Sequence, residues 1–478
     1  MAHIEEIHIA PESLDRFTAL VGSEQIEEIS RIATATARRM AGRVWWNVSS
    51  TARGGGVAEM LQVLLAYARG AGIDTRWLVI QGTPEFFHIT KRLHHAIHGS
   101  HGDGSPLGDT ERSIYEKVLE ENANELIGFV QAGDVVLLHD PQTAGLASEL
   151  SHAGALVIWR SHIGVEVAND ETASAWAFLQ PYLTHVRAAV FSRGTYIPAN
   201  LELEHSVVIP PSIDPFSPKN QDLDEATIRA ILVHTGLVEG PGGDGLPIFR
   251  HTDGSPGRVS RRADVIRHGP AISWDAPLVV QVSRWDPLKD PIGVLLGFAE
   301  SEDLPPEARL ILAGPNVAGV SDDPEGAACF DDVLEAWRQL SSADRGRIHL
   351  VSLPMTDIEE NAAIVNALQR HAAIVVQKSL HEGFGLTVTE AMWKSRPVVA
   401  SRVGGIQDQI EDGIHGLLIN DPTDLTAFGS ALSRLFGDHE VAEYLGTNAH
   451  ERVRHDFLGP RHLARYAELL ERIEQQPC

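Results

Sequence analysis

The stretch SLHEGFGLTVTEAMWK, residues 379–394, decides which fold and which kind of site to expect. It continues from the apolar run AAIVVQKS, which has the character of a buried strand. Gly383 and Gly385 then lie directly before a helical pattern, so backbone amides can meet an anion at the start of a helix. Glu382 and Glu390 can accept hydrogen bonds from hydroxyl groups of the same ligand. One glutamate here is commonly only a favourable acid at a helix start, but the whole string with its glycines predicts a phosphate-binding loop.

Outward from this stretch, apolar runs alternate with helical patterns in both halves of the chain. The second half contains PLVVQVSR (277–284), RLILAGP (309–315), RIHLVSL (347–353), AAIVVQKS (372–379), PVVASRVGG (397–405) and GLLIN (416–420). The first half contains RVWWNV (43–48), TRWLVI (75–80), DVVLLHD (134–140), ALVIWRSH (155–162) and AAVFS (188–192). Runs that are apolar throughout indicate parallel strands covered on both faces. Two such series predict an α/β fold with two doubly wound, Rossmann-like domains that face a central cleft.

The expected domain boundaries follow from segments rich in proline and glycine, which interrupt the regular patterns. An N-terminal domain over 1–215 begins with an amphipathic helix in residues 1–42 and ends in SVVIPPSID, whose two prolines indicate a linker. Residues 216–273 form a linker and an irregular insertion, because the part from about 236 is rich in Gly, Pro and Arg and shows no periodicity. The C-terminal domain covers 274–455. A last helix, about 456–478, is a candidate to pack back on the N-terminal domain.

Composition limits the possible partners. The chain has 478 residues, with 39 basic and 65 acidic side chains and a formal charge of -26, so a broad nucleic-acid surface is not expected. No apolar stretch is long enough to cross a membrane, and the N-terminus has no apolar signal region, which makes the cytoplasm the default location. The two cysteines are too few for a disulfide framework. An anionic ligand would need a local positive site in this acidic protein.

Two further loops are candidates for that positive site. Gly54, Gly55 and Gly56 open a helix after RVWWNV, which suits either close approach to an anion or simply a tight turn. Glu59 stands where a dinucleotide fingerprint needs its third glycine, which counts against NAD or FAD. The other loop, in QVSRWDPLKD, carries Arg284 and Lys289 beyond the second domain's first strand. These two cations either bind a diphosphate or are solvated surface charges.

At this point the residues match a known family. EGFGL followed by Glu390 resembles the donor-site signature of glycosyltransferase family four, and VSRWDPLKD is similar to its phosphate-contacting segment. WNVSSTARGGGVAEML, QGTPEFFHITKRLHHAIHG, LLHDPQTAGL and WRSHIG resemble, more narrowly, the trehalose glycosyltransferring synthases. The resemblance covers nearly the whole chain. The Gly/Pro/Arg-rich segment near 236–273 departs from it, since it looks longer than the usual form.

The resemblance implies roles for individual residues. The catalytic set is His162, Asp140, Arg284, Lys289 and Glu382. The donor-binding set is Gly55, Gly56, Arg284, Lys289, Glu382, Gly383, Phe384, Gly385, Leu386 and Glu390. The acceptor-binding set is Asp140, Glu85, Lys91 and Arg193. From sequence alone, a histidine such as His162 would more often be structural, Asp140 could cap a turn, and Lys378 could be either solvated or near the phosphates.

The expected activity is retaining transfer of glucose from a nucleoside diphosphate glucose to glucose, which forms trehalose reversibly by a front-face route. We expect no required cofactor and no metal, small-molecule partners only, and a homodimer as a candidate assembly. One alternative is a transferase with a sugar phosphate or cyclitol acceptor, for which Arg53 and Lys91 could supply cations. A nucleotide-sugar epimerase and a non-enzymatic sugar-nucleotide sensor are the others. The nucleobase cannot be read from the sequence.

Overall fold

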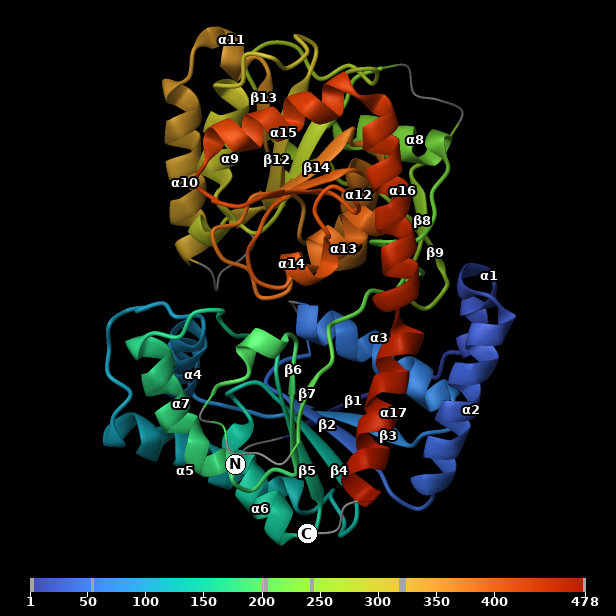
Figure 1. The fold of residues 1–478 in the computed structure, drawn as a ribbon, viewed down its shortest axis with the longest axis vertical. Coiled ribbons are helices and arrows are strands. Elements are labelled where there is room, and N and C mark those ends of the chain that lie inside the picture. The colour runs from blue at the N-terminus through green and yellow to red at the C-terminus, as the bar shows by residue number, and fades with distance from the viewer. Residues whose placement is uncertain are drawn as a thin grey trace. The chain divides into compact units, whose positions relative to one another are not determined.

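The computed structural model describes residues 4–52, 56–199, 201, 205–240, 245–317 and 324–475. The chain divides into two compact units, which Figure 1 shows as two α/β bodies. Unit 1 consists of residues 1–212 and 457–478, and unit 2 of residues 213–456. The chain therefore passes from one unit to the other twice, after Ser212 and after Asp456.

Unit 1 contains a seven-stranded sheet in the order β1-β3-β2-β4-β5-β6-β7. The strands are β1 Glu5–Ile7, β2 Trp45–Ser49, β3 Thr75–Val79, β4 Val135–His139, β5 Leu156–Ser161, β6 Ala188–Phe191 and β7 Ser206–Val208. All are parallel except β1, which pairs antiparallel with β3. The helices are α1 Thr18–Val21, α2 Ser23–Arg39, α3 Gly56–Gly70, α4 Pro84–Ile97, α5 Asp109–Leu126, α6 Ala147–His152, α7 Asp170–Leu183 and α17 Gly459–Gln475, with 3-10 turns η1 Leu14–Phe17, η2 Ala144–Leu146 and η3 Gly194–Tyr196. Helix α17 lies beside α2 and α3 (Figure 1).

Unit 2 contains a second seven-stranded sheet, in the order β10-β13-β12-β11-β14-β15-β16. The strands are β10 Asp264–Ile266, β11 Leu278–Val282, β12 Arg309–Pro315, β13 Ile348–Leu353, β14 Ile374–Gln377, β15 Val398–Ser401 and β16 Leu417–Ile419, with a separate hairpin of β8 Ile248–Arg250 and β9 Pro256–Arg258. Only β10 runs antiparallel to its neighbour, β13. The helices are α8 Glu225–Thr235, α9 Pro291–Ala299, α10 Pro324–Gln339, α11 Ser342–Arg345, α12 Ile358–His371, α13 Leu386–Trp393, α14 Ile406–Gln409, α15 Leu425–Gly437 and α16 His439–Asp456, with η4 Pro287–Lys289.

The apolar runs form these sheets because both faces of each central strand are covered by helices (Figure 1). Every residue of β2 and β4 is buried, as is every residue of β13 and β14. The core of unit 1 packs around Trp46, Leu138 and Trp159. That of unit 2 packs around Leu310, Ile348 and Val376. The expected α/β fold with two Rossmann-like sheets is confirmed.

The N-terminal expectation was wrong in part. Residues 1–42 were expected to be one amphipathic helix, but β1 pairs with the edge strand β3 and only α2 is a long helix. Gly22 breaks the pattern, since its φ of 91° is outside the helical range. The backbone partners of β1 lie some seventy residues along the chain, as in the pairing of Glu5 with Val79, and local periodicity carries no sign of them.

The segment expected to be an irregular linker and insertion, 216–273, is more regular than its composition suggested. It contains α8, the β8–β9 hairpin and the edge strand β10. The hairpin turns at Gly254, whose φ is 82°, and the amide of His251 donates to Ser255 O over 2.9 Å. Glu360 of α12 accepts the amide of Arg261 at 2.7 Å. Strands of three residues are too short to show a period, so the sequence could not reveal them.

Candidate functional site

Each sheet has one point at which the strand order reverses, and ligands of doubly wound sheets bind beyond the carboxyl ends of the strands there. In unit 2 this point lies between β11 and β14, because β12 and β13 continue on one side and β15 and β16 on the other. In unit 1 it lies between β2 and β4. Arg284 and Lys289 follow β11, Glu382 follows β14, and Asp140 follows β4. The topology thus places these predicted residues at the two switch points.

Lys289 and Glu382 form the centre of the site in unit 2. The Lys289 ammonium lies 2.7 Å from Glu382 Oε2, and the two side chains are 17% and 11% exposed. The Ser379 hydroxyl donates to the same carboxylate at 3.2 Å. The loops that carry the pair are joined through their backbones, since the amide of Leu380 donates to Leu288 O over 2.8 Å. A cation and a carboxylate are therefore held side by side.

The turn that aims Lys289 is specified locally. Asp286 caps η4 by accepting the amide of Leu288, and Asp290 caps α9 with a φ of 48°. Lys378 was expected to be either solvated or near the phosphates. The solvated alternative is wrong, because its side chain is fully buried in an ion pair with Asp290. Lys378 thus fixes the turn after Lys289.

Arg284 lies in the same loop but differs from Lys289 in exposure. Its side chain is 70% exposed, and its guanidinium is 3.3 Å from Asp286. A guanidinium that is so exposed and so lightly held is free to reorient toward an anion, at low cost from the weak surface pair with Asp286.

The loop from Gly383 to Leu386 has the geometry expected of an anion-binding helix start. Gly385 precedes α13 with a φ of 84°, in the left-handed region, and no side chain caps that helix within the described residues. The amide of Gly405 donates to Gly383 O at 2.9 Å, while the Gln409 amide donates to Phe384 O. The carbonyl groups of the loop are therefore fixed by hydrogen bonds. The first amides of α13 lie at the carboxyl edge of the sheet.

Glu390 lies within α13 and is only 4% exposed. Its Oε1 is 3.5 Å from the ammonium of Lys219, which sequence reasoning did not single out. Asn220 accepts the ammonium of Lys394 at 3.0 Å on the same helix. Burial lowers the pKa of Lys394 to about 7, and the charge of Glu390 opposes that shift. The segment at 219–220 thus completes the surroundings of Glu390, although it is about 170 residues away in sequence.

In unit 1, Asp140 and His162 are brought together. Asp140 has a φ of 63°, which is strained for a residue other than glycine, and its Oδ1 accepts the amide of His162 at 2.8 Å. His162 Nε2 lies 3.1 Å from His139 Nδ1, and the rings stack. His139 Nε2 is in turn 3.2 Å from Asn47 Oδ1, so a polar chain runs from β2 to the end of β5.

Burial dominates the protonation of this group. It raises the pKa of Asp140 to about 7, against the opposing effects of the His162 amide and of the Arg160 charge. It lowers the pKa of His139 to about 3 and that of His162 well below its ordinary range. The neutral form of both imidazoles is therefore favoured, and Asp140 titrates near neutrality.

The remaining predicted residues lie on separate elements. Glu85 and Lys91 are both exposed on α4, which begins at Pro84 with Thr83 as its cap. Arg193 is only 8% exposed and forms an ion pair with Glu166. Gly55 and Arg53 lie outside the described residues. Gly56 begins α3.

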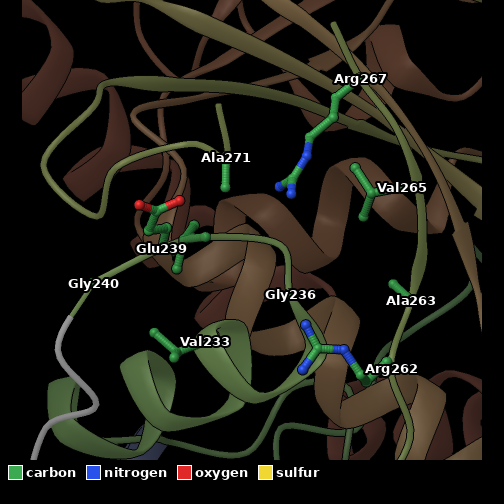
Figure 2. A pocket seen from close by; sticks show the side chains of 10 residues that line it. Val233, Gly236, Glu239, Gly240, Arg262, Ala263, Val265, Arg267 and Ala271 are labelled. Atoms are coloured by element: carbon green, nitrogen blue, oxygen red, sulfur yellow. The ribbon is translucent and has the colours of Figure 1, made fainter. Parts of the chain in front are cut away.

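A pocket of about 440 Å³ opens elsewhere in unit 2 and contains none of the predicted residues. Figure 2 shows the guanidinium groups of Arg262 and Arg267 on one side of it and the carboxylate of Glu239 on the other. Both arginines are exposed, and Arg262 lies against Gly236, the residue that ends α8. A cation is favoured at a helix C-terminus, so the position of Arg262 has a structural explanation.

Among the described residues, no group of three or more His, Cys, Asp or Glu side chains could hold a metal ion. No helix in the same part of the chain has both the length and the apolar character needed to cross a membrane.

Comparison with known proteins agrees with this geometry. A family model described as the trehalose synthase N-terminal domain matches residues 47–198, and one described as glycosyl transferases group 1 matches residues 264–452. The trehalose synthase of Pyrococcus horikoshii is 32% identical over 99% of both chains. That of Rubrobacter xylanophilus is 34% identical over 96% of both. The solved α,α-trehalose-phosphate synthase (UDP-forming) from Burkholderia vietnamiensis superposes with a TM-score of 0.65 at 14% identity, over 91% of this chain and 99% of that one.

The two sheets, the family models and the residues at the switch points define the class of protein, which is a glycosyltransferase of the GT-B fold. Within that class, the sequence identity above 30% to trehalose synthases over nearly the whole length shows the family. The chain belongs to the trehalose synthase family.

Proposed function

We propose that this glycosyltransferase moves glucose from a nucleoside diphosphate glucose to glucose, reversibly and with retention at the anomeric carbon, and so forms trehalose. The observation that carries the proposal is the Lys289–Glu382 pair at the switch point of unit 2. It sets a cation suited to a diphosphate beside a carboxylate suited to sugar hydroxyls. The names of the full-length relatives support the product.

In the proposed mechanism, unit 2 holds the donor. Lys289, Arg284 and the first amides of α13 bind the diphosphate, whose charge grows as the bond from the anomeric carbon to phosphate oxygen breaks. Glu390 binds the ribose hydroxyls. The bond from the anomeric carbon to the acceptor oxygen forms on the same face, and the departing phosphate takes the acceptor's proton. These placed cations supply the charge stabilisation, so the reaction requires no cofactor and no metal.

Unit 1 contributes Asp140 and His162 to the sugars in this proposal. Asp140 accepts hydroxyl hydrogen bonds while its carboxyl group is ionised, and His162 orients the hydroxymethyl side of the donor. Glu85, Lys91 and Arg193 are proposed acceptor residues. Burial keeps both His139 and His162 uncharged, which suits hydrogen bonding to neutral hydroxyls.

Product analysis tests the proposal. Labelled ADP-, UDP- and GDP-glucose are each incubated with the enzyme, alone and with glucose, glucose 6-phosphate or inositol. Trehalose that appears only with glucose, with the label's α-configuration kept, is the expected result. A product formed only with glucose 6-phosphate or inositol would assign a different acceptor. Epimerised donor without any acceptor would assign an epimerase, and binding without turnover a sensor.

An additional incubation with trehalose and inorganic phosphate distinguishes the proposed transfer from phosphorolysis. The trehalose phosphorylase of Grifola frondosa is 25% identical over 85% of this chain and 54% of its own length. If the chain cleaves trehalose with phosphate alone, glucose 1-phosphate appears and no nucleotide is needed. We expect cleavage only with a nucleoside diphosphate.

A further inference from the structure

Arg160 is a fully buried arginine in the sheet of unit 1. It lies on β5, and His162 follows directly after the end of this strand. Its guanidinium donates to His462 Nε2 at 3.0 Å, to the Tyr466 hydroxyl, and to Ile209 O at 3.1 Å. All three partners are uncharged acceptors.

No carboxylate in the described part of the chain forms an ion pair with Arg160. A buried guanidinium is costly unless a carboxylate neutralises it, and removing such groups in favour of apolar ones is often neutral or stabilising. Helix α17 has a second contact of this kind, because the partly buried Arg187 donates to Ile473 O on the same helix at 3.5 Å. Tethering α17 therefore does not require a buried charge at position 160.

The charge of Arg160 acts on a defined set of groups. Facing it are His139 and Asp140 from the end of β4, His162 from β5, and His462 and Tyr466 from α17. After burial, Arg160 is the next cause that lowers the pKa values of His139, His162 and His462. For Asp140 its charge opposes burial and so favours the carboxylate.

The residues of the hydrogen-bond network around Arg160 also lie close to both passages of the chain between the units. Ile209 and Ser212 directly precede the first passage, while His462 and Tyr466 follow the second. The Ser212 hydroxyl lies 2.9 Å from His462 Nδ1. One hydrogen-bond network thus joins β5, which ends directly before His162, to the two segments of unit 1 that lie next to the passages into unit 2.

We propose that Arg160 is a positioning residue of the sugar site: its unneutralised charge keeps Asp140 ionised and the His139–His162 pair neutral, and its hydrogen bonds fix β5 against α17. This role rests on the proposed function of Asp140 and His162. Arg160 itself touches no substrate. It acts through the Asp140 carboxylate, which already accepts the His162 amide.

The test uses the full chain with Arg160→Met and Arg160→Gln, which remove the charge, and Arg160→Lys, which keeps it. The dependence of kcat/KM on pH reports the free enzyme. In the wild type the acid limb is expected near pH 7, where Asp140 loses its proton. Without the charge, the limb should move up by roughly one pH unit. Below the limb that shift lowers kcat/KM about tenfold. Arg160→Lys should keep the limb, and Arg187→Gln is the matched control.

A second measurement does not depend on the reaction. NMR of the enzyme with labelled histidine follows the protonation of His139 and His162, which should begin at higher pH in both neutral variants than in the wild type. If these titrations shift but no glycosyl transfer is found, the proposed function fails and the role of Arg160 survives. An acid limb and histidine titrations that match the wild type in a folded neutral variant would overturn the proposal. So would failure of both neutral variants to fold, since Arg160 would then be structural only.

Discussion

The pairing of Lys289 with Glu382 determines what a donor has to displace. Both side chains are largely buried, and the ammonium lies 2.7 Å from the carboxylate. When phosphate takes the cation and a sugar hydroxyl takes the carboxylate, each loses one partner and gains another. In the proposed function, the two groups of this ion pair therefore bind different parts of the donor.

A double-mutant cycle at this pair separates its structural from its functional role. Lys289→Met and Glu382→Gln should each lower kcat/KM by on the order of 10²- to 10³-fold, the usual loss when one placed charge is removed from a reacting centre. Each single variant should also lose stability, because it removes one member of an ion pair whose side chains are both largely buried.

The double variant should recover most of the stability, since no unpaired charge remains, but none of the activity. Urea unfolding of the wild type, the two single variants and the double variant gives the cycle for stability. Initial rates of the same four proteins give the cycle for activity. A double variant with near-wild-type activity would remove both residues from the proposed mechanism.

At the scale of elements, the start of α13 is where the proposed function has the donor's diphosphate bind. Gly385 has a φ of 84°, and an added Cβ would lie 3.1 Å from Ile406 and 3.2 Å from Glu382. Gly385→Ala should therefore cost about 1–2 kcal/mol of stability through backbone strain and also weaken nucleotide binding, because the loop amides move.

Gly413 provides the matched control. Its φ is 77°, and nothing lies within 4 Å of an added Cβ, so Gly413→Ala carries the strain without touching the site. Isothermal titration of nucleoside diphosphate into both variants distinguishes them. Equal affinities in the two would mean that the loop before α13 does not contact the diphosphate.

The strands show how much of the fold could be predicted from the sequence. The central parallel strands lie where the apolar runs predicted them, because burial on both faces leaves a continuous signal. The edge strand β1 and the edge strand β10 were not predicted, since each has three residues and depends on a distant partner. The edge strand β16 also has three residues but lies in the predicted run GLLIN, so what sets β1 and β10 apart is their antiparallel pairing with a distant strand.

The candidate site divides in a similar way. Glu382, Lys289 and Asp140 could be found because each lies in the loop after an apolar strand. Lys219 could not, because it reaches Glu390 across a long sequence separation and has no motif of its own. Arg160 lies inside a strand, where a charged residue looks like an interruption rather than a partner of His162.

For the whole molecule, burial of histidines sets how stability depends on pH. Six histidines have lowered pKa values, with burial as the largest cause in each: His139, His162, His349, His371, His415 and His462. In the unfolded chain they take up protons near pH 6.5, but the folded protein resists this. Their contribution is therefore complete above pH 6.5 and is lost as the pH falls toward about 4. Asp140 and the exposed His101 act in the opposite sense, because a raised pKa favours the fold at low pH.

The free energy of unfolding should consequently fall between pH 6.5 and 4, by about 1.4 kcal/mol per pH unit for each histidine that is protonated only when unfolded. His349, in β13, has its pKa lowered to about 4 by burial and by the charge of Arg267. His349→Gln should therefore reduce the slope for unit 2 by about that amount. His439, with a side chain that is 93% exposed, provides the control, and His439→Gln should leave the slope unchanged. Urea titrations from pH 4 to 8 measure both, and a slope that His349→Gln leaves intact would mean that this histidine is protonated equally in the folded and unfolded states.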